Sequence, residues 1–231
     1  MNRLHVTLLA AGLCLAVGTA ARPQMGSDFF KRPAISSLLK PVLGNGSVYE
    51  TSHTGQASAT KSTMEWLVVG KELADGKDAF WLEIGMHMKG FDGTVYSKAL
   101  ISKDDFHVHR TIMQMPGHPA MEMNVNTSSQ EDQRKQDELS QWSQAGTETV
   151  IVPAGTFVCQ HWKKNDGKSE VWANDQISPF GMVKEISPTS SMVLVKVITD
   201  AKDHITGPVT QFDPQAFRQM MMDQMSSQKP N

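Results

Sequence analysis

The sequence predicts a mainly β fold of the α+β class, built on an antiparallel sheet. From Ser47 onwards, several segments alternate apolar and polar side chains, the pattern of strands that bury one face. Asp-Gly pairs at 75–76, 92–93 and 166–167 separate these segments. Asp-Gly suits tight hairpin turns, because a positive φ costs little there. Hairpins in series indicate a meander.

The first predicted element is a helix over residues 25–43. Pro33 suits the first turn of a helix, and Pro41 with Gly44 would end it. The apolar side chains of this segment recur at helical spacing, which favours one buried face. They are Ile35, Leu38, Leu39 and Val42.

The clearest strand is FWLEIGMHM, residues 80–88. In a strand, one face of this segment carries only apolar side chains, so we expect it to be half-buried. Such a face needs cover from other strands, from helices or from a ligand, because a large exposed apolar patch promotes aggregation. The face comprises Phe80, Leu82, Ile84, Met86 and Met88.

Three later segments complete the expected architecture. Residues 128–143 predict a short crossover helix between two groups of strands, with a capping-box spacing at its start. The segment SMVLVKVI, residues 191–198, predicts a central strand covered on both sides. In the tail, Asp213 is a candidate cap and Pro214 suits the first turn of a short helix.

Residues 1–21 have the pattern of a secretory signal peptide: Arg3 precedes a short apolar stretch and then small residues. A lipoprotein signal acting through Cys14 is the alternative, disfavoured because Cys14 lies inside the apolar stretch. We expect residues 22–212 to form one β-rich half-barrel domain and 213–231 to form a short helix and a disordered tail. The expected location is the periplasm or the medium.

Composition limits the class of partner. With 22 basic and 24 acidic residues, the chain lacks the basic excess typical of nucleic-acid binding. No segment after the signal is apolar and long enough to predict a transmembrane span. Cys159 alternates with Phe157 in an apolar stretch, which favours a buried small side chain over a reactive thiol. We expect a monomer.

The stretch FHVHRTIMQMPGHPAMEM, residues 106–123, raises the possibility of a metal site. Thioethers and imidazoles bind copper, and pairs at i, i+2 share a strand face. In a regular strand, however, His109 and Met113 would lie ~13 Å apart and could not bind one ion. We therefore favour methionine as a flexible filler of an apolar interior, with His107 and His109 facing solvent. A periplasmic copper-binding protein is the alternative.

No motif predicts an enzyme. The chain has no Gly-rich phosphate loop, no Gly-x-Ser-x-Gly and no His-Glu-x-x-His. Asp104 and Asp105 precede His107, but adjacent acids before a strand are typical of a solvated turn. We expect no catalytic residues and no cofactor.

Three stretches together resemble a known superfamily: GSVYE at 46–50, VPAGTFVCQHW at 152–162 and EVWANDQISPFGMVKEIS at 170–187. Over roughly residues 47–199 the chain resembles exported bacterial proteins that are similar to outer-membrane lipoprotein carriers and receptors of the Lol type. The resemblance implies a strongly curved sheet, a half-barrel, with an N-terminal helix and a short crossover helix covering its concave face. Carriers of this type hold acyl chains in that concavity.

The resulting hypothesis is an exported, non-enzymatic protein that binds a lipid, acyl chain or other hydrophobic small molecule in a concave apolar interior. Besides copper binding, a purely structural envelope module is an alternative, and it applies if the concave face is completely filled. The predicted lining residues are Trp66, Leu82, Ile84, Met86 and Met88.

Overall fold

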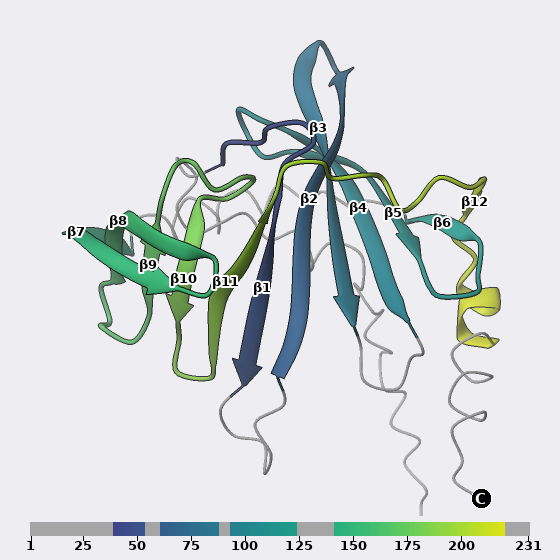
Figure 1. The fold of residues 1–231 in the computed structure, drawn as a ribbon. Coiled ribbons are helices and arrows are strands. Elements are labelled where there is room, and N and C mark those ends of the chain that lie inside the picture. Colours follow the sequence, from purple (N-terminus) through teal and green to yellow (C-terminus); the bar gives the residue numbers. More distant parts are fainter. Residues whose placement is uncertain (1–38, 54–60, 88–92, 124–140, 220–231) are drawn as a thin grey trace, which may run out of the picture.

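The computed structural model describes residues 39–53, 61–87, 93–123 and 141–219. These residues form a twelve-stranded open sheet in the order β12-β6-β5-β4-β3-β2-β1-β11-β10-β9-β8-β7. Figure 1 shows the sheet bending between the strands of its two halves. The predicted fold class, mainly β with a curved sheet, is confirmed.

Two antiparallel meanders make up the sheet. The first consists of β1 (Gly46–His53), β2 (Lys61–Ala74), β3 (Lys77–His87), β4 (Thr94–Ser102), β5 (Val108–Gln114) and β6 (Ala120–Met123). The second consists of β7 (Trp142–Val152), β8 (Gly155–Lys164), β9 (Glu170–Ala173), β10 (Met182–Ile186) and β11 (Ser190–Ile198). Strand β1 pairs antiparallel with β11 and so joins the meanders. The last strand, β12 (Val209–Gln211), pairs parallel with β6, which departs from the predicted all-antiparallel sheet.

Two of the predicted Asp-Gly turns lie within the described residues and join neighbouring strands. Asp75 and Gly76 have φ values of 51° and 76° between β2 and β3. Positive φ at both central positions is the requirement that Asp-Gly satisfies in a tight hairpin. Gly167 lies between β8 and β9 with a φ of 67°.

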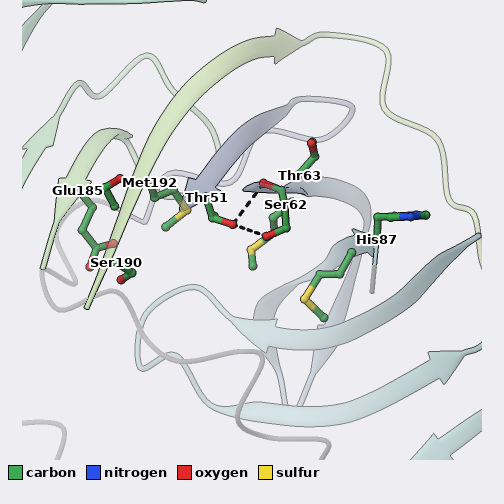
Figure 2. A pocket seen from close by; sticks show the side chains of 10 residues that line it. Thr51, Ser62, Thr63, His87, Glu185, Ser190 and Met192 are labelled. Carbon is green, nitrogen blue, oxygen red and sulfur yellow. Dashed lines mark hydrogen bonds between the residues drawn. The ribbon is translucent and has the colours of Figure 1, made fainter. Parts of the chain in front are cut away.

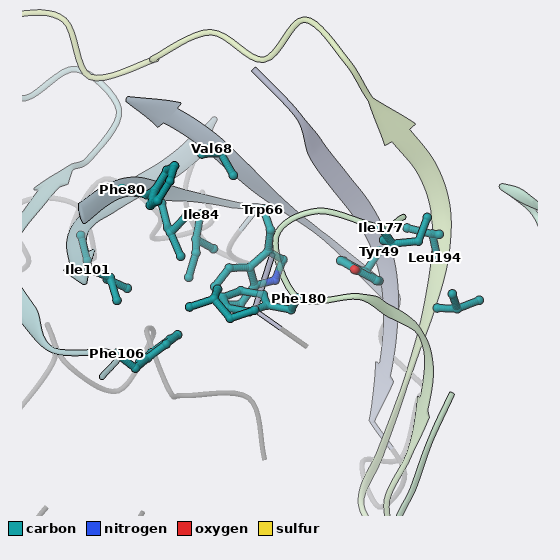
Figure 3. Packing of buried hydrophobic residues seen from close by; sticks show 14 of the residues in the cluster. Tyr49, Trp66, Val68, Phe80, Ile84, Ile101, Phe106, Ile177, Phe180 and Leu194 are labelled. Atoms are coloured by element: carbon teal, nitrogen blue, oxygen red, sulfur yellow. The ribbon is translucent and has the colours of Figure 1, made fainter. Parts of the chain in front are cut away.

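The concave face of the sheet is filled at its centre by the loop of residues 174–181, which joins β9 to β10. The Phe180 ring stands edge-on to the Trp66 ring, with centroids 4.7 Å apart, and lies 6.2 Å from the Phe106 ring. Figure 3 shows the Phe180 ring between Trp66, which lies on β2, and Phe106. Leu82 and Ile84 of β3 are each only 1% exposed beside this cluster.

The loop is fixed by hydrogen bonds at both of its ends and along its length. The Asn174 amide donates to the Gly181 carbonyl at 2.7 Å, which closes the loop. The Ser47 hydroxyl in β1 donates to the Ser178 carbonyl at 2.9 Å. The Lys40 amide donates to the Pro179 carbonyl at 2.8 Å. One of these bonds closes the loop on itself, and the other two attach it to β1 and to the segment before β1.

A C-terminal segment around residues 203–205 covers the convex face. The His204 ring nitrogen Nδ1 lies 2.6 Å from a carboxylate oxygen of Glu83, which is fully buried. The Lys98 ammonium donates to the Ile205 carbonyl at 2.8 Å and pairs with Asp203. Strand β3 is therefore buried on both faces, whereas the sequence predicted a half-buried strand. Alternation could not reveal this, because the second face carries Glu83, whose partner His204 lies far along the chain, and because Ile205 packs near Trp81 on that face.

Several predicted elements differ from the structure. Residues 39–42 have no helical structure and Leu43 lies in a turn, so the prediction of a helix over 25–43 is wrong for these five residues. Trp142 and Ser143 belong to strand β7, so these two residues are not part of the helix predicted over 128–143. Strand β11 is central, as predicted, but its Val197 is 37% exposed, so it is not covered on both sides. The remaining parts of both predicted helices and the predicted signal peptide lie outside the described residues.

The predicted start of the C-terminal helix is confirmed. A helix occupies residues 214–219, and the Gln215 amide donates to the Asp213 carboxylate at 2.8 Å. Phe217 of this helix packs with the buried Met113 and Met115. Within the described residues, no helix has the length and apolar character needed to cross a bilayer.

Replacing the Phe180 ring should destabilise the whole fold. Phe180→Ala is expected to lower the free energy of unfolding by about 3–5 kcal/mol, since it removes a buried ring and leaves a cavity against Trp66. Urea denaturation followed by tryptophan fluorescence measures the change. Val158→Ala is the control, because Val158 is 63% exposed, and it should stay within about 0.5 kcal/mol of the wild type. Equal effects of the two substitutions would contradict this packing.

Glu83 should make stability fall with rising pH. Burial raises the pKa of Glu83 from 4.5 to about 7. Between these values the folded protein holds a proton that the unfolded chain releases, so the free energy of unfolding decreases as pH rises. Glu83→Gln should flatten this decrease between pH 4.5 and 7 in urea denaturation series. The exposed Glu72→Gln should keep the wild-type slope, and parallel curves for wild type and Glu83→Gln would refute the assignment.

Candidate functional site

A pocket of about 350 Å³ opens on the concave face beyond its packed centre. It lies near the ends of the central strands, where β1 and β3 finish and β2 and β11 begin. Strands β1, β2, β3, β10 and β11 all contribute to its wall. Its size lies at the lower end of the range for small-molecule sites, about 300–1,000 Å³. The lining residues are Thr51, Ser62, Thr63, Met64, Met86, His87, Glu185, Ser190, Ser191 and Met192.

Strand register aligns the central lining residues in a row. Glu185 pairs with Met192, and Met192 pairs with Thr51. Thr51 in turn pairs with Ser62. Paired residues in adjacent strands project from the same face, so these four side chains form one line across β10, β11, β1 and β2. In Figure 2, Glu185 and Ser190 lie at one side of the pocket and His87 at the other, with Thr51 and Ser62 between them.

Three methionines supply the apolar part of the wall. Met64 pairs with Met86 across β2 and β3. Met192 belongs to the row that begins at Glu185, and all three pack against the edge of the main core as partly buried side chains. Methionine has three rotatable bonds and a polarisable sulfur, so this wall can adapt to different apolar shapes.

The hydroxyl groups in the row are partnered within the protein. The Thr51 and Ser62 hydroxyl oxygens lie 2.6 Å apart, and the Thr51 hydroxyl also donates to the Ser62 carbonyl at 3.2 Å (Figure 2). At the rim, the Ser190 and Ser187 hydroxyl oxygens are 2.8 Å apart. None of these contacts joins a hydroxyl to a side-chain base, so they give the pocket a polar band without activating a nucleophile.

Glu185 is the charged group of the pocket wall. Burial raises the pKa of its carboxyl above the ordinary value of 4.5. Within the described residues, no hydrogen bond or ion pair reaches this carboxylate. A partly desolvated carboxylate without a partner is unfavourable. A bound molecule that supplied a hydrogen-bond or ion-pair partner would therefore stabilise the Glu185 carboxylate.

The structure separates the residues that the sequence analysis assigned to a ligand cavity. Met86 lines the pocket. Trp66, Leu82 and Ile84 lie instead in the main core, at 8%, 1% and 1% exposure, under the loop that carries Phe180. Met88 lies outside the described residues. The loop explains the difference, because it occupies the part of the concave face where the cavity was expected.

Other lining residues, including Met64, Met192, Thr51 and Glu185, were not predicted. Met192 lies in the segment 191–198, which the sequence predicts to be a strand. The meeting of these lining residues depends on the β1–β11 pairing, which joins residues about 140 positions apart, such as Thr51 and Met192. No local pattern encodes that register. Glu185 had no signal, because a single glutamate near a strand end is ordinarily solvated.

Residues 106–123, the stretch rich in methionine and histidine, contain strands β5 and β6 and the turn between them. Residues 116–118 form the predicted turn. The prediction that His109 faces solvent is wrong: its side chain is 12% exposed. Its Nε2 lies 2.6 Å from the Ser102 hydroxyl and its Nδ1 lies 3.3 Å from Asp75. An irregularity in the β4–β5 pairing turns His109 inward, which strict alternation could not anticipate.

Methionine does act as an apolar filler in this stretch. Met113 and Met115 are each 5% exposed and pack with Val95, Met123 and Phe217. Cys159 is also fully buried, as predicted, and burial raises the pKa of its thiol to about 11. The copper hypothesis stays a prediction. Within the described residues, no group of three or more His, Cys, Asp and Glu side chains is arranged to hold a metal ion.

A second polar cluster surrounds His161 on β8. Its Nδ1 lies 2.8 Å from Glu148 and its Nε2 lies 2.7 Å from Glu170, while its ring stacks on Trp172 with centroids 4.4 Å apart. The Trp172 indole donates to Glu148 at 2.8 Å, and this hydrogen bond and the His161 contact lower the pKa of Glu148. Both imidazole nitrogens are occupied, so His161 has no free nitrogen for a metal or a substrate. The cluster therefore links β7, β8 and β9.

No family model and no curated protein matches the chain. Solved structures with some likeness include a candidate lipoprotein from Parabacteroides distasonis, with 13% identity and a TM-score of 0.36 over 69% of this chain and 97% of that one. A candidate exported protein with a YmcC-like fold from Bacteroides fragilis has 11% identity and a TM-score of 0.35, over 69% and 98%. A DUF1329 family protein from Desulfovibrio piger has 12% identity and a TM-score of 0.32, over 68% and 85%.

Two of these three proteins are described as exported or as lipoproteins, and none of the three as a lipoprotein carrier or receptor of the Lol type. Because the TM-scores are below 0.5, the likeness carries no argument about this chain. The resemblance to Lol-type carriers therefore stays a prediction.

Proposed function

We propose that this protein is an exported, non-enzymatic binding protein that holds a hydrophobic small molecule in the methionine-lined pocket. The observation that carries the proposal is the pocket itself: about 350 Å³, with Met64, Met86 and Met192 in its wall. Its place in the cell, the periplasm or the medium, follows from the signal-peptide pattern of residues 1–21.

The division of the concave face supports this proposal over a purely structural module. The centre is packed by Phe180, and the sheet gains its stability there. The methionines at the end of the face are only partly buried, so their apolar surface has no complete cover among the described residues. A ligand that covers this surface would gain free energy of about 25 cal/mol per Å² of apolar area removed from water.

The chemistry of the lining also favours binding over catalysis. The Thr51 and Ser62 hydroxyls pair with each other. His87, the histidine of the wall, is exposed at the rim. A nucleophile needs a base within hydrogen-bond reach and an orienting group behind the base, and the lining residues show no such arrangement.

Binding can be tested with a neutral fluorescent probe such as N-phenyl-1-naphthylamine, titrated into detergent-free protein. The wild type should bind it saturably. Met86→Ser should weaken binding about fivefold, since it removes about 1 kcal/mol of apolar contact. Met123→Ser is the matched control, because Met123 is partly buried in a separate cluster with Met113 and Phe217.

The control should retain wild-type affinity, and circular dichroism should show both variants folded. Absence of saturable binding by the folded wild type would overturn the proposal and leave the structural module. Equal weakening by Met86→Ser and Met123→Ser would place binding elsewhere and contradict the assigned pocket.

A further inference from the structure

We infer that the pocket selects amphiphilic cations, with a protonated amine against Glu185 and the apolar part of the ligand against Met64 and Met86. This inference rests on the proposed function and adds the chemical class of the ligand. It arises from the arrangement of charge and apolar surface along the wall.

The charge in the wall has one sign. Among the ten lining residues, Glu185 is acidic and none is lysine or arginine. The other ionisable lining residue, His87, is exposed at the rim. A ligand with a carboxylate or phosphate head would therefore meet a like charge without a compensating cation. A cationic head would give Glu185 the partner that it lacks within the described residues.

Glu185 lies at one end of the wall and the Met64–Met86 pair at the other. Glu185 is on β10, and the Met64–Met86 pair is on β2 and β3. With strands ~4.8 Å apart, four steps from β10 to β3 span ~19 Å along the curved sheet. Met192 and the paired hydroxyls of Thr51 and Ser62 lie between these ends. The wall thus places its carboxylate at one end and offers methionine side chains both beside it and at the far end, which suits a ligand with one charged head group and an apolar chain.

Burial of Glu185 strengthens the expected selectivity. Because the carboxylate is partly removed from water, its interaction with a charged head is less screened than at the surface. The same burial raises the pKa of its carboxyl, so the selectivity is measured at pH 8, which favours the carboxylate form while an alkylamine is still protonated.

Competition against the neutral probe tests the inference. Decylammonium and decanoate, which have equal chain lengths, are each titrated at pH 8 below their micelle concentrations. The wild type should bind decylammonium about tenfold or more tightly than decanoate, as one charge-assisted contact implies. Glu185→Gln should reduce this ratio to near one when both affinities are measured on the variant itself. Glu185→Lys should reverse it.

Glu72→Gln is the matched control, because it removes the same charge from an exposed position towards the other end of β2. It should retain the wild-type ratio. If the probe binds but the wild type does not prefer decylammonium, or if Glu185→Gln retains the preference, the inference fails and the proposed function stands. If the folded wild type does not bind the probe, the proposed function fails and the inference fails with it.

Discussion

The contact between Phe180 and Trp66 closes the centre of the concave face, and the position of the pocket depends on it. A curved sheet with a continuous apolar face needs cover, and here a loop of eight residues between β9 and β10 supplies it at the centre. The loop reaches that position because β1 and the segment before it hold its carbonyl groups at Ser178 and Pro179. Hydrogen bonding thus fixes the loop, and ring packing makes its position favourable.

This insertion also locates the pocket. The loop covers Leu82 and Ile84, but it does not cover the next residues along the same face of β3 and β2, where Met86 and Met64 pair. The β1–β11 pairing then brings Met192 and Glu185 from the second meander to the same end of the sheet. The concave face therefore has two parts. Its centre packs against the loop and stabilises the fold, and the part near the strand ends forms a partly apolar pocket wall with a partly buried carboxyl group.

The sequence predicted those features that depend on local spacing. The alternation in residues 80–87, the Asp75-Gly76 turn and the Asp213 cap are each encoded within a few residues, and each was found. Of the described residues that the sequence assigned to a cavity, Met86 lies in this pocket. The rest of the wall depends on a register between distant strands and on a loop whose path has no periodic signal. Burial of Glu83 was missed for the same reason, since its partner His204 lies 121 residues away.

The most direct test of this division is NMR spectroscopy of protein labelled with ¹³C at the methionine methyl groups, titrated with a neutral hydrophobic ligand. Signals of Met64, Met86 and Met192 should shift together and saturate. Signals of Met113, Met115 and Met121, which lie in β5, β6 and the turn between them, should stay in place. Shifts confined to that second group, or no shift in any methionine at saturating ligand, would contradict the account.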